Sequence, residues 1–363
     1  MKIVIDARES GTTTGRYIDN LIKHLHGLKS GHSFTILSLP KRTGFMNSIA
    51  PDYEIITTKF KEFSLGEQTG LKKQIENIKP DLVHFPMVQQ PIFYRGRVVT
   101  SMLDLTTLRF KNPVKNKILY SLKQQVYKFV NLRAAKKSKI IICISEYVKN
   151  DIVKFARIPS EKIIVTYNAA ELIHDDPKAI EAIEGKQFIM YIGRPLPHKN
   201  LDRLIEAFAQ LQRTYSDLYL VLAGKKDTLY EAHEQNVLKK GIKNVIFTGF
   251  VSDGELRWLY EHTACYVFPS LSEGFGLPGL EAMAHGAPVA SSNATCLPEV
   301  YGDAAVYFDP NNSGAVAGAV HDVLNDHELA KQLKQKGFVQ AQKYSWERMA
   351  RQTLEAYEKA LSL

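Results

Sequence analysis

Two glutamates bracket a glycine-rich turn in the stretch SEGFGLPGLE. Glu273 stands before the turn, and Glu281 stands about one helical turn into the segment that follows. Gly274 and Gly276 allow a ligand to approach the backbone closely. Sugar hydroxyls donate hydrogen bonds and need acceptors, so two carboxylates at this spacing suit a ligand with two sugar rings flanking a phosphate. The alternative is a solvated loop acid followed by a surface helix residue, and the pattern alone favours neither.

The turn follows the apolar run CYVFPS, so it lies at the carboxyl end of a predicted strand. A predicted helix begins near Leu277 and continues to Gly286, with Pro278 well suited to its first turn. The N-terminus of a helix presents N–H groups and the positive end of the helix dipole, and phosphate binds readily there. The sequence therefore predicts that a phosphate can bind where this helix starts.

A second group of candidate residues lies in GRPLPHKN, which starts at Gly193 and follows the predicted strand FIMYI. Arg194 and Lys199 thus lie at a strand end in the same half of the chain as Glu273, where two cations can neutralise a diphosphate without a metal ion. The alternative for Lys199 is a solvated side chain near a helix start. A cation is slightly unfavourable there, so a functional role is favoured.

Candidates near the start of the chain are weaker. The first predicted strand ends in DAR and leads through GTTTGRY into a helix. Gly11 and Gly15 resemble a phosphate-facing loop, but their spacing matches neither a P-loop nor G-x-G-x-x-G, so a plain turn is an equal alternative. Asp104, at the end of VVTSMLD, is a candidate carboxylate for the acceptor side, although a helix cap or turn acid is the favoured interpretation.

Residues 111–139 form a strongly basic segment with nine Lys or Arg and no Asp or Glu. The apolar residues recur near helical spacing and predict a basic amphipathic helix that can lie on an anionic membrane surface. A packed helix with a solvated polar face is an equal alternative. Nucleic acid is a weaker third choice, because no recognisable RNA- or DNA-binding module accompanies the segment. The apolar positions are Ile118, Leu119, Leu122, Val126, Phe129, Val130 and Leu132.

The secondary structure that positions these candidate residues can be predicted from the pattern of apolar residues. Short apolar runs alternate with segments of helical period, which indicates parallel sheets covered by helices on both faces. The thirteen runs are too many for a single eight-stranded barrel. The polar stretch HDDPKAIEAIEGKQ interrupts the alternation, which places a linker at residues 169–186. The prediction is an α/β protein with two doubly wound, Rossmann-like domains that bind ligands at the carboxyl ends of their strands, in the cleft between domains. The runs are KIVIDA, SFTILSL, YEIITT, DLVHFP, RVVTSMLD, KIIICIS, KIIVTYN, QFIMYIGR, LYLVLAGK, NVIFTGF, CYVFPS, PVASSN and AVYFDP.

The composition of the chain limits which partners and which cellular compartment are expected. The 363 residues carry a net charge of +9, concentrated in the first half, which nucleic acid or a membrane surface would explain equally well. The chain has no run of eighteen apolar residues and opens with a strand pattern rather than a signal peptide, which predicts a cytoplasmic protein. Cys143, Cys265 and Cys296 stand far apart, which favours reduced core thiols over a disulfide framework or a zinc site.

Taken together, these motifs resemble the retaining glycosyltransferases of the GT-B fold, in particular glycosyltransferase family 4. The resemblance spans nearly the whole chain, and its second half is the more specific part. It implies an acceptor-binding domain at residues 1–170, a nucleotide-sugar-binding domain at 171–345 and a helix at 346–363 that crosses back to the first domain. The stretches that carry it are DARESGTTTGRYIDNL, ICISEYVKNDI, YIGRPLPHKNLDRLIEAF, EGFGLPGLEAMAHGAPVASSNATCLPEV and YSWERMARQTLEAY.

The resemblance also implies roles for the candidate residues. Glu273 would contact the donor sugar near the reacting centre, and Glu281 would bind the ribose hydroxyls of the nucleotide. Arg194 and Lys199 would hold the diphosphate. The backbone of Phe275, Gly276 and Leu277 would assist at the helix start, and Gly15 would lie near the same phosphates from the first domain. The family commonly has His before the position of Asp104, and Leu103 stands there in this chain.

The expected reaction is a metal-independent, retaining transfer of a hexose from a nucleotide diphosphate sugar to a saccharide or lipid-linked acceptor. No cofactor is expected, and the chain has no Asp-x-Asp triplet of the metal-binding kind. GDP-mannose is the favoured donor because the second-half motifs look most like bacterial mannosyltransferases, and UDP-glucose is an alternative. A nucleotide-sugar epimerase and a non-catalytic relative that binds nucleotide or membrane are the rival classes. The protein would work in the cytoplasm, peripherally on the inner face of the membrane.

Overall fold

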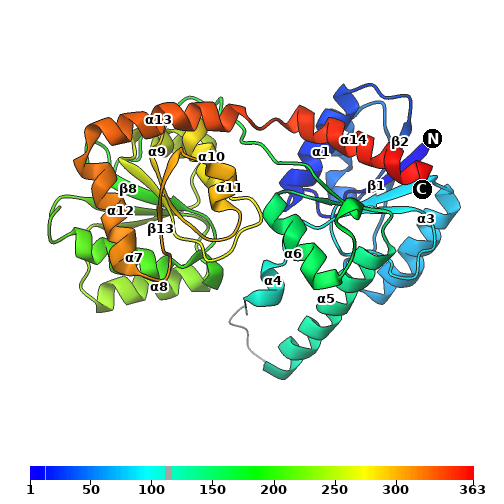
Figure 1. The fold of residues 1–363 in the computed structure, drawn as a ribbon, viewed down its shortest axis with the longest axis horizontal. Coiled ribbons are helices and arrows are strands. Elements are labelled where there is room, and N and C mark those ends of the chain that lie inside the picture. Colours follow the sequence, from blue (N-terminus) through cyan, green and yellow to red (C-terminus); the bar gives the residue numbers. More distant parts are fainter. Residues whose placement is uncertain (13, 111–116) are drawn as a thin grey trace. The chain divides into compact units, whose positions relative to one another are not determined.

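The computed structural model describes residues 1–12, 14–110 and 117–363, which form two compact units (Figure 1). The first unit contains Met1–Leu108, residues 117–168 and Ser345–Leu363. The second contains Arg109, Phe110 and Ala169–Tyr344, whereas the sequence placed the divisions after residues 170 and 345. Each unit is built on its own sheet.

The sheet of the first unit has seven parallel strands in the order β3-β2-β1-β4-β5-β6-β7. Its central strands carry apolar residues with no exposed surface, such as Ile3, Val4 and Ile5, as expected for a parallel sheet covered on both faces. The strands are β1 (Lys2–Asp6), β2 (Ser33–Ser38), β3 (Glu54–Thr57), β4 (Leu82–Phe85), β5 (Val98–Ser101), β6 (Ile140–Cys143) and β7 (Ile163–Val165).

The second unit has six parallel strands in the order β10-β9-β8-β11-β12-β13. All thirteen predicted strands are therefore present, and the predicted α/β class with two doubly wound sheets is confirmed. The strands are β8 (Phe188–Ile192), β9 (Tyr219–Ala223), β10 (Val245–Gly249), β11 (Cys265–Phe268), β12 (Val289–Ser292) and β13 (Ala305–Phe308).

Helices connect successive strands, and several begin at a side chain that caps the free amides of the first turn. Ser145 accepts a hydrogen bond from the amide of Val148, and Ser252 forms a capping box with Glu255. The helices are α1 (Gly15–Gly27), α2 (Thr43–Ile49), α3 (Lys72–Ile78), α4 (Thr106–Arg109), α5 (Lys117–Lys137), α6 (Glu146–Ala156), α7 (Leu201–Leu211), α8 (Thr228–Lys239), α9 (Asp253–His262), α10 (Leu277–Ala284), α11 (Leu297–Tyr301), α12 (Ser313–Asn325), α13 (His327–Gln342) and α14 (Trp346–Ser362).

Each sheet has one point at which the chain changes direction across the strands. In the first unit this point lies between β1 and β4, and in the second it lies between β8 and β11. The loops that leave such a pair of strands run to opposite sides, which opens a crevice at the carboxyl ends. These two places are therefore where ligand-binding residues are expected.

The C-terminal helix α14 belongs to the first unit and packs beside α1 (Figure 1). A buried polar network joins it to the sheet. The His84 ring lies 2.6 Å from the Tyr357 hydroxyl through Nδ1 and 2.8 Å from Ser101 Oγ through Nε2, and the Tyr17 hydroxyl lies 2.9 Å from the same Oγ. The network satisfies polar groups that would otherwise be costly to bury.

We expect the first unit to lose stability below about pH 6.5 because of His84. Burial lowers the pKa of His84 to about 3, whereas a histidine in an unfolded chain titrates near about 6.5. Between these values the unfolded chain binds a proton that the folded chain does not, so the free energy of unfolding falls as pH falls. In urea unfolding, the stability advantage of wild type over His84→Gln should shrink by about 2 kcal/mol between about pH 7.5 and about pH 5. An advantage that stays constant would contradict this.

Candidate functional site

The loops that follow β8 and β11 are tied together at the direction change of the second sheet. The amide of Leu271 donates to the carbonyl of His198 at 2.7 Å. The Asn200 side chain donates to the carbonyls of Pro269 and Pro310 at 3.1 and 2.8 Å. These bonds hold the GRPLPHKN loop against the turn that carries Glu273. Asn200 was not singled out from the sequence. An Asn just before a helical pattern is a signal for a helix cap, but this side chain makes no cap hydrogen bond and bonds to the two carbonyls instead.

Lys199 and Glu273 form an ion pair at this place. Lys199 Nζ lies 2.6 Å from Glu273 Oε1, and the two side chains are 19% and 12% exposed. The ammonium also lies 5.6 Å from the centroid of the Phe268 ring at the end of β11. The structure thus brings together two of the predicted residues. An ammonium has three donors, so Lys199 can keep Glu273 and still bind an anionic oxygen.

The neighbouring His198 stays neutral near pH 7. Burial and the charge of Lys199 lower its pKa to about 4, although Glu273 opposes this. Its ring is therefore a neutral donor or acceptor, and the positive charge of this loop comes from lysine and arginine.

The start of α10 is shaped by glycine. Gly276 has φ +90°, and a Cβ there would lie 2.5 Å from the Tyr301 hydroxyl, which donates to the Gly276 carbonyl at 2.5 Å. Because the N-cap residue is glycine, it has no side chain to occupy the first amides of the helix. Phe275 is buried and packs edge-to-face on Tyr344 at 5.4 Å, which fixes the turn, and Leu277 begins the helix. The predicted helix start is therefore present, with no side chain capping it.

Glu281 lies inside α10 and is 8% exposed, so it is not the surface helix residue that the alternative interpretation required. Its carbonyl accepts a hydrogen bond from His285 Nδ1 at 2.8 Å, and His285 Nε2 accepts one from the amide of Ile173 at 3.0 Å. Burial lowers the pKa of His285, which is consistent with this neutral tautomer. A carboxylate is seldom buried without a partner, and Glu281 has interactions within the protein. That Glu281 binds the ribose stays a prediction.

Arg194 lies at the end of β8 but is engaged elsewhere. Its Nε lies 2.9 Å from Asp227 Oδ2, and its side chain is 63% exposed. Asp227 also caps α8 by accepting from the amides of Leu229 and Tyr230. This partner was missed from the sequence, although Asp before the helical pattern TLYE is an N-cap signal. That Arg194 shares a diphosphate with Lys199 stays a prediction.

Gly193 precedes Arg194 and has φ +143°. A Cβ there would lie 2.9 Å from the Tyr191 hydroxyl, and the Gly193 carbonyl accepts from the Tyr230 hydroxyl at 3.0 Å. Any larger residue would push the loop off these tyrosines. The Tyr191 ring stacks with Phe268, and the Lys199 ammonium lies over the Phe268 ring.

The candidates in the first unit have local structural partners. Gly15 begins α1, its amide donates to Thr12 Oγ1 at 3.0 Å, and a Cβ there would overlap the Glu9 carbonyl oxygen. Asp104 is exposed and accepts from the amide of Thr106 at 2.8 Å, as its turn interpretation expects. That Gly15 lies near the phosphates of the donor, and that Asp104 is a carboxylate of the acceptor side, both stay predictions.

In the described parts of the chain, no group of three or more His, Cys, Asp or Glu is placed to hold a metal ion. The three cysteines are buried. No helix of those described parts is both long and apolar enough to span a bilayer.

Two family models match consecutive parts of the chain. The model described as Glycosyltransferase Family 4 matches residues 14–172, and the model described as Glycosyl transferases group 1 matches residues 173–340. Among curated proteins, O-antigen chain mannosyltransferase B of Escherichia coli is 32% identical over 234 residues, 61% of each chain. O-antigen chain mannosyltransferase RfbU of Salmonella typhimurium is 31% identical over 203 residues, 55% of each. The matched region is thus less than two thirds of either relative's length.

Solved structures share the whole fold. Sucrose-phosphate synthase of Thermosynechococcus elongatus superposes with a TM-score of 0.79 at 16% identity, covering 99% of this chain and 98% of that one. Anabaena HepE, solved with UDP and glucose, gives a TM-score of 0.74 at 17% identity and covers 99% of each chain. The two parallel sheets and this likeness define the GT-B class of glycosyltransferases. The chain belongs to glycosyltransferase family 4 within that class.

Proposed function

We propose that the protein transfers a hexose from a nucleotide diphosphate sugar to a hydroxyl of a saccharide or lipid-linked acceptor, with retention of configuration and without a metal ion. The observation that carries the proposal is the Lys199–Glu273 pair, 2.6 Å apart and largely shielded from water, at the direction change of the second sheet. A cation and a carboxylate held together there suit a ligand that joins a phosphate to a sugar.

The chemistry follows from the charge that develops. The bond between the anomeric carbon and the diphosphate oxygen breaks as the sugar becomes oxocarbenium-like, so negative charge grows on the diphosphate. Lys199, Arg194 and the N-terminus of α10 stabilise that charge. The acceptor hydroxyl attacks on the same face, and its proton passes to the departing phosphate oxygen. Glu273 orients the sugar and Glu281 the ribose, so no carboxylate nucleophile of the glycosidase kind is needed.

Mannose is the proposed sugar and GDP-mannose the proposed donor. The support is that both relatives described above are named mannosyltransferases and match this chain at 31–32% identity. Their matched region covers part of their length, so the acceptor is proposed only by class, as a saccharide that grows in cell-surface polysaccharide or glycolipid synthesis.

A thermal-shift panel of GDP, UDP, ADP and their sugar conjugates tests the donor site. A ligand that binds only the folded state raises the melting temperature. We expect GDP and GDP-mannose to stabilise the wild type and Glu281→Ala to abolish most of this shift, because the ribose loses its acceptor. Glu328→Ala, a change of an exposed glutamate on α13 of the same unit, is the matched control. If UDP compounds stabilise the protein instead, the proposed donor changes from GDP-mannose to a UDP-sugar. If none of the nucleotides raises the melting temperature, the proposed function is overturned.

We also propose that α5 docks on an anionic membrane. Residues 111–116 of the predicted basic helix lie outside the described residues. In the described part, Leu122, Val126 and Phe129 share one face and are each more than half exposed, and Arg133 and Lys136 continue that face. The helix is packed on its other side, where Val130, Ala134 and Ala135 are buried. Phe63, also more than half exposed, lies beside α5 with its ring 6.0 Å from that of Tyr127.

Liposome sedimentation tests this docking. We expect the wild type to pellet with anionic vesicles at low salt, because apolar side chains enter the interface while the cations attract the headgroups. Changing Leu122, Val126 and Phe129 together to serine should weaken binding by at least about tenfold. Leu238→Ser, an exposed apolar residue on α8, is the control. Wild-type protein that ignores anionic vesicles at low salt would rule out the proposed docking.

A further inference from the structure

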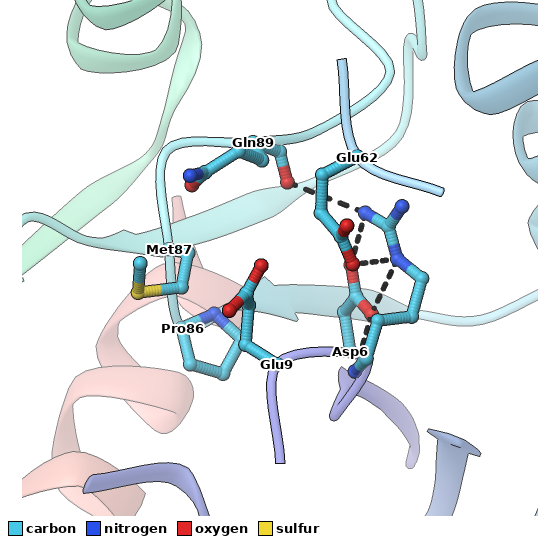
Figure 2. Close-up of a pocket in the computed structure, with 7 residues that line it drawn as sticks. Asp6, Glu9, Glu62, Pro86, Met87 and Gln89 are labelled. Carbon is cyan, nitrogen blue, oxygen red and sulfur yellow. Dashed lines mark hydrogen bonds and ion pairs between the residues drawn. The ribbon is translucent and has the colours of Figure 1, made fainter. Parts of the chain in front are cut away.

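Polar groups of the protein hold the loops at the direction change of each sheet. In the first unit, Arg8 Nη2 lies 2.7 Å from Asp6 Oδ2 and 2.8 Å from Glu67 Oε1. Figure 2 marks the contacts of this cluster with Asp6 and with the carbonyl of Gln89. In the second unit, the loop after β11 carries Glu273, and two of the groups that hold it come from the loop after β12.

The loop after β12 is a neighbour of the turn that carries Glu273, because β11 and β12 are paired in parallel and their carboxyl ends lie at the same edge of the sheet. Hydrogen bonds fix the start of this loop. The amide of Asn293 donates to the Phe308 carbonyl at 2.9 Å, and the amide of Ala294 donates to the Ser292 hydroxyl at 3.0 Å. The loop can therefore serve as a fixed support for the residues beside it.

Thr295 and Cys296 of this loop bind the backbone of Glu273 on both sides. The amide of Glu273 donates to Thr295 Oγ1 at 3.1 Å, and the Cys296 thiol donates to the Glu273 carbonyl, with Sγ 3.3 Å from the oxygen. Burial, and after it the charge of Glu273, raises the pKa of Cys296, so the thiol keeps its proton for this bond. The backbone of Glu273 is thus held while its carboxylate contacts Lys199.

The backbone of Thr295 is left-handed, with φ +56°. Among the non-glycine residues of the described chain that have positive φ, Thr295 alone is β-branched. A branched side chain makes this conformation costly, and it persists only where the surrounding structure compensates for it, which is frequent at active sites. In this conformation the side chains of two successive residues, Thr295 and Cys296, both reach Glu273.

We propose that Thr295 is a positioning residue for sugar transfer, whose hydroxyl fixes the amide of Glu273 and so the direction in which the Glu273 carboxylate points. The proposal rests on the proposed function, because that function gives Glu273 a sugar to orient. A rotation of the Glu273 backbone would move the carboxylate away from both the sugar and Lys199. Such a misplacement costs catalysis more than it costs binding of the donor.

Initial rates with the nucleotide sugar found in the thermal-shift panel test this role. Thr295→Val removes the hydroxyl but keeps the β-branched shape, so the cost of the left-handed backbone is unchanged. We expect kcat to fall about tenfold or more and KM for the donor to change less than about threefold, because the misalignment is felt mainly in the transition state. Thr295→Ser keeps the hydroxyl and should retain kcat within about threefold of wild type.

A double-mutant cycle tests whether Thr295 acts through Glu273. In a Glu273→Gln background, Thr295→Val should lower kcat by less than about threefold more, because the carboxylate that Thr295 directs is already absent. Thr214→Val, a change of an exposed threonine in the turn after α7, is the matched control and should leave kcat and KM unchanged. Wild-type kcat in Thr295→Val, a Thr295→Ser as slow as Thr295→Val, or an equal loss in the Glu273→Gln background would each overturn the proposal.

The GDP thermal shift on the same variants separates this role from the proposed function. Thr295→Val should keep the wild-type shift, which shows that the variant is folded and still binds the nucleotide. A purely structural role would instead lower its melting temperature and leave the kcat of the folded enzyme intact. Wild-type protein that binds no nucleotide and turns over no donor overturns the proposed function, and the role of Thr295 falls with it. An active wild type with an unaffected Thr295→Val overturns the role of Thr295 alone.

Discussion

Replacing Lys199 with alanine is expected to lower kcat/KM for sugar transfer by about 10²–10³-fold. Lys199 lies 2.6 Å from Glu273 and is largely shielded from water, so its charge is little screened by solvent. In the proposed reaction this charge acts on the departing diphosphate, and its loss is felt mainly in the transition state. Initial rates of transfer, or of donor hydrolysis, with the nucleotide sugar found in the thermal-shift panel would measure the effect.

Two further variants distinguish the loss of the Lys199 charge from a general effect of changing a lysine. Lys199→Arg keeps the charge and should retain more activity than the alanine variant. Lys331→Ala removes an exposed cation from α13 and should leave the rate unchanged. A loss of less than about tenfold in Lys199→Ala, with its melting temperature intact, would contradict a role in stabilising the leaving group.

Replacing Arg8 with methionine is expected to lower the free energy of unfolding by about 3–5 kcal/mol. The change leaves Asp6 and Glu67, 6% and 1% exposed, as buried carboxylates without their cation. Both would then resist ionisation, so the loss should be greater at high pH, where the unfolded chain carries both charges, than at low pH. Urea unfolding near pH 5 and near pH 8 measures both the size and the sign of this dependence.

The surface offers a matched pair for comparison. Arg351 lies 2.7 Å from Glu347 on α14, with side chains 59% and 61% exposed. Arg351→Met should therefore change stability by less than about 1 kcal/mol. Adding Glu67→Gln to Arg8→Met should recover part of the loss, because one buried charge disappears. Similar effects for Arg8→Met and Arg351→Met would show that the buried cluster adds little stability.

The sequence anticipated much of the candidate site. Glu273, Lys199 and the glycine start of α10 were all placed at strand ends, because the apolar runs and the Gly-Pro pattern are local signals. It did not predict the ion pair itself. Lys199 and Glu273 are 74 residues apart, and they meet because β8 and β11 are neighbours in the sheet although β9 and β10 intervene along the chain.

The partners of the arginines were missed for the same reason. Arg194 pairs with Asp227, and Arg8 pairs with Glu67 across 59 residues. Neither Asp227 nor Glu67 belongs to a sequence motif from which its arginine partner could be predicted. The sequence also did not predict which apolar residues of α5 are buried. Leu122 and Val126 face solvent, while Val130 is buried. Helical spacing predicts which residues share a face, but it does not tell which face the rest of the protein covers.

By itself, the sequence determined the thirteen strands, the two-sheet class and the residues at the strand ends. The reason is that the spacing of apolar residues that distinguishes strands from helices is a property of residues close together in the chain. Only the tertiary structure decided which strand ends lie side by side and which cations are already paired. Those features depend on sheet order and loop conformation, which are set by contacts between residues far apart in the chain.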